Sequence, residues 1–585
     1  MKDHTRLDAE NRQAALDRME AEHFDVVIVG GGVTGAGAAL DAATRGLSVA
    51  LIEQRDWAAG TSSRSSKLIH GGLRYLEQLD VGLVLEAKRE QKLMLNRLCP
   101  HLVEPVSFLF PLKHFAWERA YVGMGVLIYD LIARGRVLPR HRHLGRRATL
   151  RTFPSLRKKR LRGSIQYWDG LVDDARHTLC LVRTAALHGC AVASSTRCED
   201  FLRAGSRVTG VKARCLESGR TLEIRASQVI NATGVWTDRI QNMAGRGRIQ
   251  VRASKGIHLV VPRDRIHGDS GLILRTENSV LFVIPWKDHW IIGTTDTDWN
   301  LDLAHPAASR KDVDYLLDQA NQILDRPLRH EDIEGVYAGL RPLLRGETDE
   351  SSELSRTHAV SRSVSGLITV AGGKYTTYRV MARDTIDLAV AGLERPAPAS
   401  CTETTPLVGA PGFKGWWNRR EALASESGLH ISQIEHLLRR YGSCIEDLLM
   451  LIQEEPALGK ALEAAPGYLR AEIVYAASHE GALHLEDVLT RRTRISIETF
   501  DRGVAAAPEV AELMGRVLGW NADTLKRELD FYDARVAAEI NSQNQPDDHT
   551  ADDARLDALD VRLGERADQR VVQLVKDPDS EHGTG

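Results

Sequence analysis

The sequence predicts an α/β protein that ends in an all-α domain, and two observations support this fold class. Phe24–Val29 is a short apolar run, followed by a glycine-rich turn, a helical pattern over Thr34–Arg45 and a second apolar run at Ser48–Ile52. This order is that of a βαβ unit with buried parallel strands. From about residue 410 the strand signals end, and helical patterns such as Ile431–Arg440 and Asp523–Glu539 continue to about residue 540.

Length and composition indicate a globular protein of several units. The 585 residues are too many for one ordinary core, so we expect about three or four structural units. A net charge of −2 gives no global field that would favour nucleic acid.

The first 23 residues lack the apolar run of a secretory signal, and no stretch reaches the roughly 18 apolar residues of a spanning helix. The seven cysteines form no CxxC pair, which favours reduced thiols in a cytosolic protein and indicates no metal site.

A glycine-rich turn after the first predicted strand indicates a dinucleotide site. The turn matches GxGxxG through Gly30, Gly32 and Gly35, and Glu53 closes the next strand. Gly30 permits the tight turn, Gly32 lets a pyrophosphate approach the backbone, and Gly35 lets the helix pack close to the sheet. Glu53 is expected to accept a hydrogen bond from a ribose 2′-hydroxyl, which argues against a 2′-phosphate. The alternative, a glycine-rich turn without a ligand, is disfavoured by the complete strand–turn–helix–strand–acid order.

A second segment favours FAD over NAD as the dinucleotide. Val229–Trp236 is a strand that runs into the small-residue turn formed by Ala232, Thr233 and Gly234. It resembles the ATG segment of flavoproteins with two dinucleotide-binding folds, in which the backbone passes close to the bound dinucleotide. Alone this segment is an ordinary strand end, but together with the glycine turn it favours FAD.

Three further segments narrow the family. They are Thr61–Leu76, with the letters TSSRSSKLIHGGLRYL, Gly335–Pro342, with GVYAGLRP, and Ala371–Arg379, with AGGKYTTYR. Together with the glycine turn they resemble the FAD-dependent glycerol-3-phosphate dehydrogenases of the glycine-oxidase-like flavoprotein superfamily. The resemblance runs from about residue 24 to residue 383 and continues more loosely through the helical C-terminal part.

The resemblance implies a two-dinucleotide-binding-type FAD fold with a mixed β-sheet substrate domain and an all-α C-terminal domain. Residues 1–23 are expected to form an extension, mobile or helical. Residues 541–585 hold 11 Asp/Glu against 5 Lys/Arg, a composition typical of a disordered tail. The predicted boundaries are an FAD-binding domain within 24–400 at about 24–105, 170–250 and 335–400, an interleaved substrate domain at about 106–169 and 251–334, and a helical domain at 413–540.

A serine-rich loop is expected to hold the cofactor. Hydroxyls and backbone amides in such a loop can bind phosphate and ribose. The alternative is a solvated polar loop, which the adjoining run Lys67–His70 disfavours. The cofactor-binding residues that we predict are Gly30, Gly32, Gly35, Glu53, Thr61, Ser62, Ser63, Ser65, Ser66, Lys67, His70, Gly71, Ala232, Thr233, Gly234, Gly373, Lys374 and Thr376.

A phosphorylated polyol needs cations for its dianion. Arginine offers a planar fork that suits phosphate oxygens, and lysine offers a point charge. The resemblance places Arg341, Arg356 and Lys374 near the substrate, with Arg74 and Tyr75 close by. For any single arginine, the alternative is a surface salt bridge, and for Arg356, in a polar stretch, that alternative is about as strong as the phosphate role.

Oxidation of the secondary alcohol also needs a group that takes the hydroxyl proton. That base must be neutral near pH 7 and lie close to the hydroxyl. His258 is our candidate because the histidine reference pKa of about 6.5 suits the task, and it matches the histidine of the family's KGxH segment, with Ile257 where a small residue is common. The alternative is a hydrogen-bonded histidine at a strand start. We therefore predict that His258, Arg341 and Lys374 form the catalytic group, and that His258 also contacts the substrate.

The resemblance implies that electrons leave to a membrane quinone. Arg134–Arg162 contains 12 Arg/Lys and no Asp or Glu, and it follows the apolar segment Trp117–Ala133. A basic stretch beside an apolar segment with Trp and Tyr favours contact with anionic lipid through residues 117–162. The alternative is a solvated basic loop beside a core helix. We expect a cytoplasmic protein in peripheral contact with the membrane, without nucleic acid, and a homodimer.

Three other functions stay open at the level of the sequence. An oxidase that passes electrons to O2 and makes H2O2 would use the same substrate motifs. An amine or amino-acid oxidase would need one carboxylate partner rather than several cations. A non-catalytic flavin-binding module would not need this set of Arg, Lys and His. For the helical C-terminal domain, the sequence favours a cap or an oligomer surface.

Overall fold

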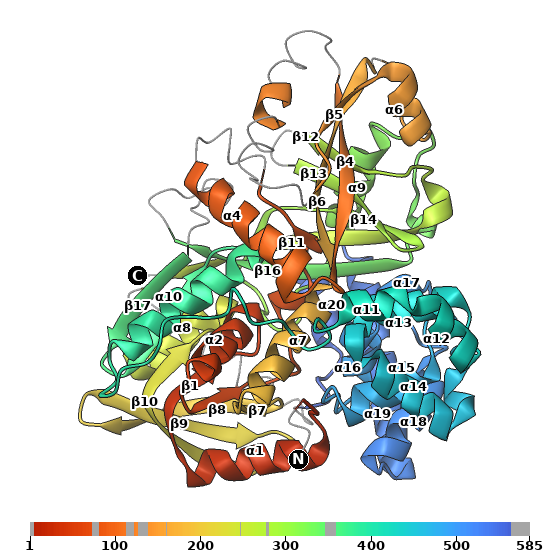
Figure 1. The fold of residues 1–585 in the computed structure, drawn as a ribbon. Coiled ribbons are helices and arrows are strands. Elements are labelled where there is room, and N and C mark those ends of the chain that lie inside the picture. The colour runs from red at the N-terminus through yellow and green to blue at the C-terminus, as the bar shows by residue number, and fades with distance from the viewer. Residues whose placement is uncertain are drawn as a thin grey trace, which may run out of the picture.

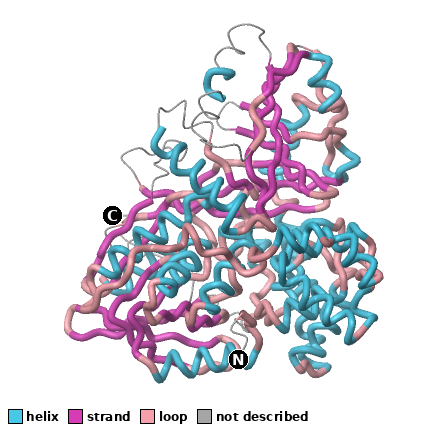
Figure 2. The backbone as a smooth tube through the Cα atoms, in the orientation of Figure 1, coloured by secondary structure: helices cyan, strands magenta, loops and turns pink. Residues whose placement is uncertain are grey.

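The structure, a computed structural model, contains two β-sheets and a helical domain (Figure 1). Figure 2 shows the strands gathered in two regions, with the helical domain beside them. The α/β fold with an all-α C-terminal part is therefore confirmed. The structure describes residues 5–72, 81–112, 122–126, 138–159, 161–245, 247, 249–275, 280–345 and 358–562.

The first sheet is built on the predicted βαβ unit. Its central strand β1 pairs in parallel with β2 on one side and with β10 on the other. Val26, Val27 and Ile28 are fully buried, as aliphatic residues are in a parallel strand covered on both faces. The strand order is β17-β18-β10-β1-β2-β7, with β9 pairing β10 and β8 pairing β9. The strands of the first sheet are β1 His23–Val29, β2 Val49–Ile52, β7 Ala191–Ala193, β8 Thr196–Ala204, β9 Arg207–Cys215, β10 Thr221–Asn231, β17 His358–Val364 and β18 Leu367–Gly372.

Helices cover both faces of the first sheet. On one face, α2 (Val33–Thr44) packs against α7 (Asp174–Leu187) and α10 (Tyr378–Val390). On the other face lies α1 (Ala9–Ala21), whose buried Leu16 and Met19 share a core with β1 and β10. The N-terminal extension is therefore helical, one of the two states predicted for it.

The second sheet is mixed, as predicted for the substrate domain. Strand β11 pairs antiparallel with β14, β15 and β16, whereas β12 pairs in parallel with β4. Helix α9 (Arg310–Asn321) shares a core with one face of this sheet. The strands of the second sheet are β3 Leu68–Ile69, β4 Val103–Leu112, β5 Arg142–Gly145, β6 Gly163–Val172, β11 Val251–Pro262, β12 Gly271–Arg275, β13 Val280–Trp286, β14 His289–Gly293, β15 Thr297–Trp299 and β16 Gly335–Leu344.

Two predicted domain boundaries are wrong in detail. Both β3 and β16 were assigned to the FAD-binding domain, but β3 pairs with β6 and β16 pairs with β11 over ten residue pairs. The physical reason is that a strand belongs to the sheet whose hydrogen bonds it completes, and its position in the chain does not decide that. As a result, β16 carries Arg341 into the same sheet that carries His258.

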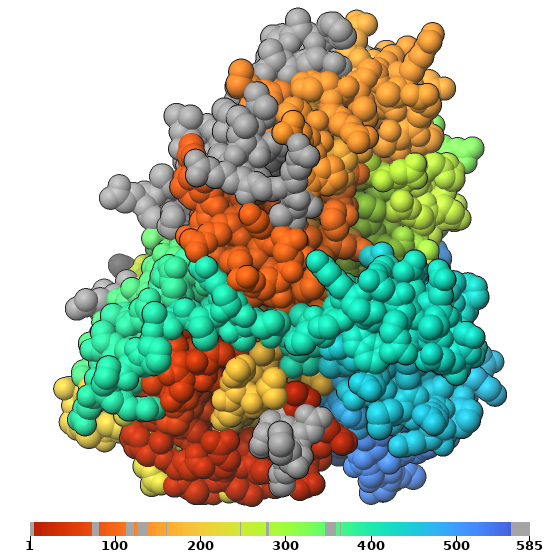
Figure 3. All heavy atoms as spheres, in the orientation of Figure 1, coloured from red at the N-terminus to blue at the C-terminus, as the bar shows by residue number. Residues whose placement is uncertain are grey.

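The predicted helical domain is confirmed, and it packs against the rest of the chain (Figure 3). Buried ion pairs cross the contact: Arg492 binds Asp56 at 2.6 Å, and Arg176 binds Glu480 at 2.6 Å. The helices are α11 Phe413–Asn418, α12 Arg420–Ser427, α13 Ile431–Tyr441, α14 Ile445–Glu454, α15 Arg470–Ser478, α16 Leu485–Asp487, α17 Ile495–Glu498, α18 Ala507–Leu518 and α19 Ala522–Ser542.

The prediction of a disordered tail is wrong for residues 541–562. This segment contains α20 (Asp548–Leu556), and Asp548 binds the buried Lys255 of β11 at 2.6 Å. Arg562 is buried and binds Asp487 at 2.8 Å. Composition misled here because the acidic side chains meet buried cations of other units instead of repelling one another. Residues 563–585 lie outside the described residues.

Candidate active site

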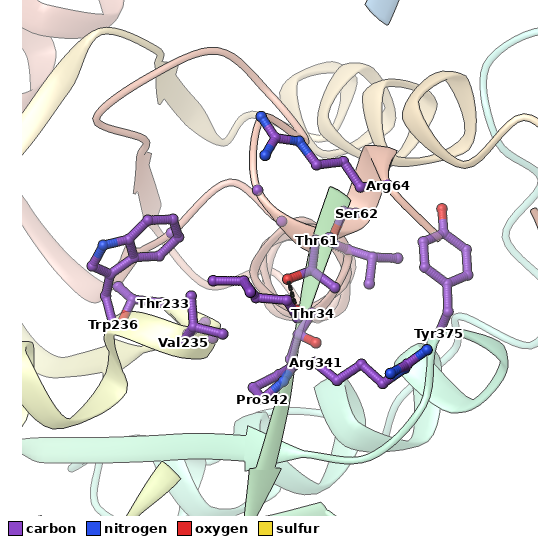
Figure 4. Close-up of a pocket in the computed structure, with 18 of the residues that line it drawn as sticks. Thr34, Thr61, Ser62, Arg64, Thr233, Val235, Trp236, Arg341, Pro342 and Tyr375 are labelled. Carbon is purple, nitrogen blue, oxygen red and sulfur yellow. Dashed lines mark hydrogen bonds between the residues drawn. The ribbon is translucent and has the colours of Figure 1, made fainter. Parts of the chain in front are cut away.

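A cavity of about 330 Å³ lies between the two sheets, at the carboxyl ends of β1, β2 and β10. In parallel α/β sheets, ligands bind at this end of the strands. Figure 4 shows side chains of the serine loop, the Thr233–Trp236 turn and β16 around it. Predicted residues that line the cavity are Gly30, Gly32, Glu53, Thr61, Ser62, Ser65, Ser66, His70, Ala232, Thr233, Gly234, His258, Arg341, Gly373, Lys374 and Thr376.

The glycine turn forms a cradle that side chains would fill. A Cβ atom on Gly35 would lie 1.9 Å from the carbonyl oxygen of Gly30, so only glycine lets α2 approach β1. Gly30 has a φ of +114°, and its Cβ would lie 2.6 Å from the carbonyl oxygen of Ala232. Gly32 precedes α2, whose N-terminus borders the cavity. The turn therefore fits a dinucleotide pyrophosphate, held by backbone N–H groups and the positive end of the helix dipole.

Glu53 lies where the sequence predicted it, at the end of β2 and on the cavity wall. Its Oε2 accepts a hydrogen bond from the backbone N–H of Gly31 at 2.7 Å, and its Oε1 accepts one from the backbone N–H of Arg55 at 2.8 Å. Burial raises the pKa of the carboxyl. A carboxylate oxygen accepts more than one hydrogen bond, so Glu53 fits the predicted contact with a ribose hydroxyl.

The serine loop uses its hydroxyls to fix its own position. The Thr61 hydroxyl donates to the Leu340 carbonyl at 2.5 Å, and the Ser62 hydroxyl accepts from the Val33 backbone N–H at 2.9 Å. The loop is thereby tied to β16 and to the first turn of α2. Of the predicted cofactor residues in this region, Ser63, Lys67 and Gly71 do not line the cavity. Gly35 does not line the cavity either, and its lack of a side chain lets α2 pack close to the glycine turn.

Lys67 corrects a prediction, because it is buried in the protein and does not reach the cofactor cavity. Its Nζ binds Asp174 at 2.8 Å and donates to the Ser63 carbonyl at 3.2 Å. Burial and then the charge of Arg494 lower the pKa of Lys67. Arg494 binds the same carboxylate of Asp174 at 2.6 Å. Lys67 therefore joins the serine loop to α7 and to the helical domain.

Replacing Asp174 with alanine is expected to lower the free energy of unfolding by about 3–5 kcal/mol, because Lys67 and Arg494 would lose a buried partner. Urea titration followed by tryptophan fluorescence measures the effect. Asp384→Ala is the matched control, because Asp384 is 35% exposed in its pair with Arg383, and exposed pairs contribute about 0–1 kcal/mol. Equal losses in the two variants would contradict the expectation.

His258 lies on the cavity wall in β11, held by contacts on two sides. Its Nε2 shares a hydrogen bond with the Ser66 hydroxyl at 2.8 Å, and its ring stacks on Tyr337 at a centroid distance of 4.7 Å. Its neighbour across the sheet, Gly293, leaves room for the ring, since a Cβ there would lie 2.2 Å from the His258 Cδ2. Burial, followed by the charges of Arg341 and Lys67, holds the pKa of His258 well below its usual value. The ring is therefore neutral near pH 7, as a base must be.

The depressed pKa predicts where activity depends on pH. A base works when it is deprotonated, so a lowered pKa moves the loss of activity to lower pH. We expect no acid limb from the enzyme between pH 6.5 and 8 in kcat/KM. The substrate phosphate itself titrates near pH 6, so its ionisation is measured separately by ³¹P NMR and removed from the profile. The expectation would be wrong if the corrected kcat/KM of the wild type still fell with decreasing pH at pH 6.5 or above and His258→Ala showed no such fall.

Arg341 and Lys374 reach the cavity from different elements. Arg341 comes from β16 and donates to Asp296 at 3.2 Å and to the Thr294 hydroxyl at 3.1 Å. In Figure 4 its side chain extends toward Tyr375. Lys374 follows β18, next to Gly373, and lines the same cavity. Arg74, Tyr75 and Arg356, which were also predicted to contact the substrate, lie outside the described residues.

Sequence reasoning missed three residues of the site. Tyr337 supports the His258 ring, Asp296 binds Arg341, and Arg64 lines the cavity. Tyr337 is directly opposite His258 in the pairing of β11 with β16. Tyr337 and Arg341 are four residues apart on one strand and thus share a face, a signal that the sequence contains. Their pairing with β11 could not be found from the sequence.

Comparisons with known proteins agree with this geometry. Residues 25–379 match the family model of FAD-dependent oxidoreductases, and residues 400–525 match that of the C-terminal domain of alpha-glycerophosphate oxidase. A glycerol-3-phosphate dehydrogenase of Mycobacterium leprae is 56% identical over 557 residues, which is 95% of each chain. The chain belongs to the FAD-dependent glycerol-3-phosphate dehydrogenase family. The mitochondrial glycerol-3-phosphate dehydrogenase of Homo sapiens is 34% identical over 90% of this chain and 74% of its own length.

Solved structures extend the family relation to the fold. A glycerol-3-phosphate dehydrogenase from Bacillus halodurans, complexed with FAD, superimposes with a TM-score of 0.75 at 28% identity, over 91% of this chain and 98% of its own. The L-alpha-glycerophosphate oxidase of Mycoplasma pneumoniae shares the fold, with a TM-score of 0.52 at 17% identity over 66% of this chain and 99% of its own. Membership of the FAD-dependent glycerol-3-phosphate dehydrogenase family confirms the predicted cofactor, FAD.

Proposed function

We propose that this chain oxidises sn-glycerol 3-phosphate to dihydroxyacetone phosphate, with FAD as the hydride acceptor and a membrane quinone as the electron acceptor. One observation supports the proposal most strongly. A neutral, buried histidine and two cations, Arg341 and Lys374, line the same cavity as the glycine cradle for FAD. The family relation to glycerol-3-phosphate dehydrogenases supports the same substrate.

The cations bind the substrate phosphate in this proposal. Arg341 offers a planar fork to two phosphate oxygens, and Lys374 offers a point charge from another side of the cavity. Asp296 and Thr294 hold the Arg341 guanidinium in place. Because the fork is already oriented, less conformational freedom is lost when the phosphate binds.

His258 removes the hydroxyl proton of the substrate. Its ring is neutral, and Ser66 and Tyr337 hold it in one orientation. FAD, when bound, would supply at its N5 atom the acceptor for the hydride from C2 of the substrate. His258 is only 2% exposed, so little water competes for its free electron pair. Gly30, Gly32 and Glu53 would hold the dinucleotide end of the cofactor.

A glycerol-3-phosphate oxidase, which reduces O2 to H2O2, is the second candidate. A specific observation favours it: residues 400–525 match the C-terminal domain of alpha-glycerophosphate oxidase. The two candidates share the substrate and differ in what reoxidises the flavin. The family relation to dehydrogenases over 95% of the chain favours the quinone.

The decisive experiment uses the purified holoenzyme under anaerobic conditions. Addition of sn-glycerol 3-phosphate is expected to bleach the visible flavin absorbance, whereas glycerol without phosphate is expected to leave it unchanged on the same timescale. The reduced enzyme is then mixed with a soluble quinone analogue or with O2 alone. Faster reoxidation by the quinone supports a dehydrogenase, and faster reoxidation by O2 supports an oxidase. A flavin that does not respond to sn-glycerol 3-phosphate would overturn the proposal.

We also propose that the basic segment contacts an anionic membrane surface. Part of the predicted range 117–162 lies outside the described residues. Among the described helices, none is long and apolar enough to cross a bilayer. Co-sedimentation with anionic vesicles at low salt tests the proposal, and no binding would overturn it. The basic residues described there are all exposed: Arg140, Arg142, Arg146, Arg147, Arg151, Arg157, Lys158, Lys159 and Arg162.

A further inference from the structure

A second, smaller cavity lies beside the cofactor cavity and has a different composition. Its volume is about 70 Å³, and among the described residues Arg64 alone lines both cavities. Its wall comes from the serine loop, residues 305–308, β16, the helical domain including α19, and the tail. Figure 4 shows Arg64 extending away from Arg341. The charged residues of the wall are Arg64, Arg491, Arg494, Arg535, Arg555, Glu486 and Glu539.

Two of these arginines pair with carboxylates that do not line the cavity. Arg491 binds Asp56 at 2.5 Å, and it also binds Asp487 at 2.6 Å. Arg494 binds Asp173 at 2.5 Å and Asp174 at 2.6 Å. Arg64, Arg535 and Arg555 lie on the same wall as the carboxylates Glu486 and Glu539, and Glu486 also pairs with Arg491 at 3.4 Å. The described wall therefore holds five arginines and two carboxylates.

The three remaining arginines have few partners, and Arg535 has buried donors that make no hydrogen bond. Among the described residues, the one hydrogen bond of the Arg64 side chain is from Nη1 to the Ala338 carbonyl at 3.3 Å, and it has no carboxylate partner. Arg535 binds Glu539 at 2.7 Å and its Nε lies 3.8 Å from Glu486, but among the described residues its Nε and Nη1 have no hydrogen-bond partner. Arg555 is 5% exposed, lies 3.7 Å from Glu539 and forms a hydrogen bond with His305 at 3.3 Å. Buried charged donors without acceptors cost free energy.

Electrostatics gives the same result. Burial, followed by the charge of Arg55, lowers the pKa of Arg64 to about 9, and burial lowers the pKa of Arg555. Burial also opposes the charge of Arg535, but Glu539 and Glu486 raise its pKa. Burial therefore disfavours the positive forms of Arg64 and Arg555, and a bound anion would offset this cost and accept the unused hydrogen bonds of Arg535.

We propose that this cavity binds one small tetrahedral oxyanion, inorganic phosphate, between Arg64, Arg535 and Arg555. The volume supports a small anion, because about 70 Å³ is far less than the about 330 Å³ of the cofactor cavity. Arginine forks suit phosphate oxygens. The oxyanion connects the serine loop with α19 and with the tail, and so couples Arg64 at the cofactor cavity to the C-terminal end of the chain.

The test counts phosphate in the oxidised holoenzyme by equilibrium dialysis with ³²P-labelled inorganic phosphate. Saturating dihydroxyacetone phosphate is added to occupy the substrate site. We expect one phosphate per chain to remain, and none in Arg535→Gln. The matched control is Arg527→Gln, an exposed arginine on the same helix α19, which should keep its phosphate.

Two outcomes would overturn the proposal: loss of all phosphate from the wild type on addition of dihydroxyacetone phosphate, or retention of one phosphate by Arg535→Gln. If Arg535→Gln fails to retain FAD, Arg555→Gln serves as the second variant, because Arg555 comes from the tail and leaves α19 intact. The inference uses the proposed function only to empty the substrate site. If that function is wrong, dihydroxyacetone phosphate displaces no phosphate from the wild type, and the comparison of Arg535→Gln with Arg527→Gln still tests the second site.

Discussion

Replacing His258 with alanine is expected to lower kcat by about 10²–10⁴-fold, the usual contribution of a general base, while FAD stays bound. The variant removes the imidazole that faces the cavity from β11 and its hydrogen bond with Ser66. Stopped-flow measurement of flavin bleaching gives the rate at which the substrate reduces the flavin. The flavin spectrum of the variant shows whether the cofactor is retained.

Two controls separate the base from a structural role. His267→Ala removes an exposed histidine from the end of the loop after β11 and is expected to keep its rate. Ser66→Ala keeps the imidazole but loses its hydrogen bond, so we expect a loss of about tenfold or less, since a neutral hydrogen bond contributes roughly 0.5–1.5 kcal/mol. Near-normal turnover of His258→Ala with FAD bound would contradict the assignment.

Replacing Arg341 with alanine is expected to lower kcat/KM for sn-glycerol 3-phosphate by about 10²-fold, mainly through KM. Two charge-assisted hydrogen bonds to phosphate contribute roughly 3 kcal/mol or more, and about 1.4 kcal/mol corresponds to a tenfold change. The effect falls on KM because the phosphate does not change charge during the oxidation. Steady-state kinetics with a soluble quinone analogue measures both constants.

The substrate itself provides the sharpest control for Arg341. Glycerol lacks the phosphate, so its slow oxidation should be equally slow in the wild type and in Arg341→Ala. Arg341→Lys keeps the charge without the fork and should recover part of the loss. Arg252→Ala, on the neighbouring strand and paired with Asp298 at the surface, should leave KM unchanged. An equal loss with glycerol would show that Arg341 acts on the fold and does not hold the phosphate.

Local patterns predicted much of the fold because they depend on neighbours in the chain. The run Phe24–Val29, the turn with Gly30, Gly32 and Gly35, and Glu53 after the second strand are close in sequence, and the structure places them as expected. Periodicity likewise predicted helices such as α13 and α19. Of the substrate residues, His258, Arg341 and Lys374 meet at one cavity.

The sequence by itself therefore determined the βαβ unit, the FAD family and the types of residue at the site, because these follow from short-range spacing and motif. Only the tertiary structure decided that Lys67 is buried against Asp174, that Tyr337 supports His258, and that Arg562 in the tail is buried against Asp487. Lys67 and Asp174 are 107 residues apart in the chain, and Asp487 and Arg562 are 75 apart. Tyr337 and His258 likewise come from distant strands, β16 and β11. Charge composition cannot show which carboxylate meets which cation, since that depends on which surfaces the hydrophobic cores bring together.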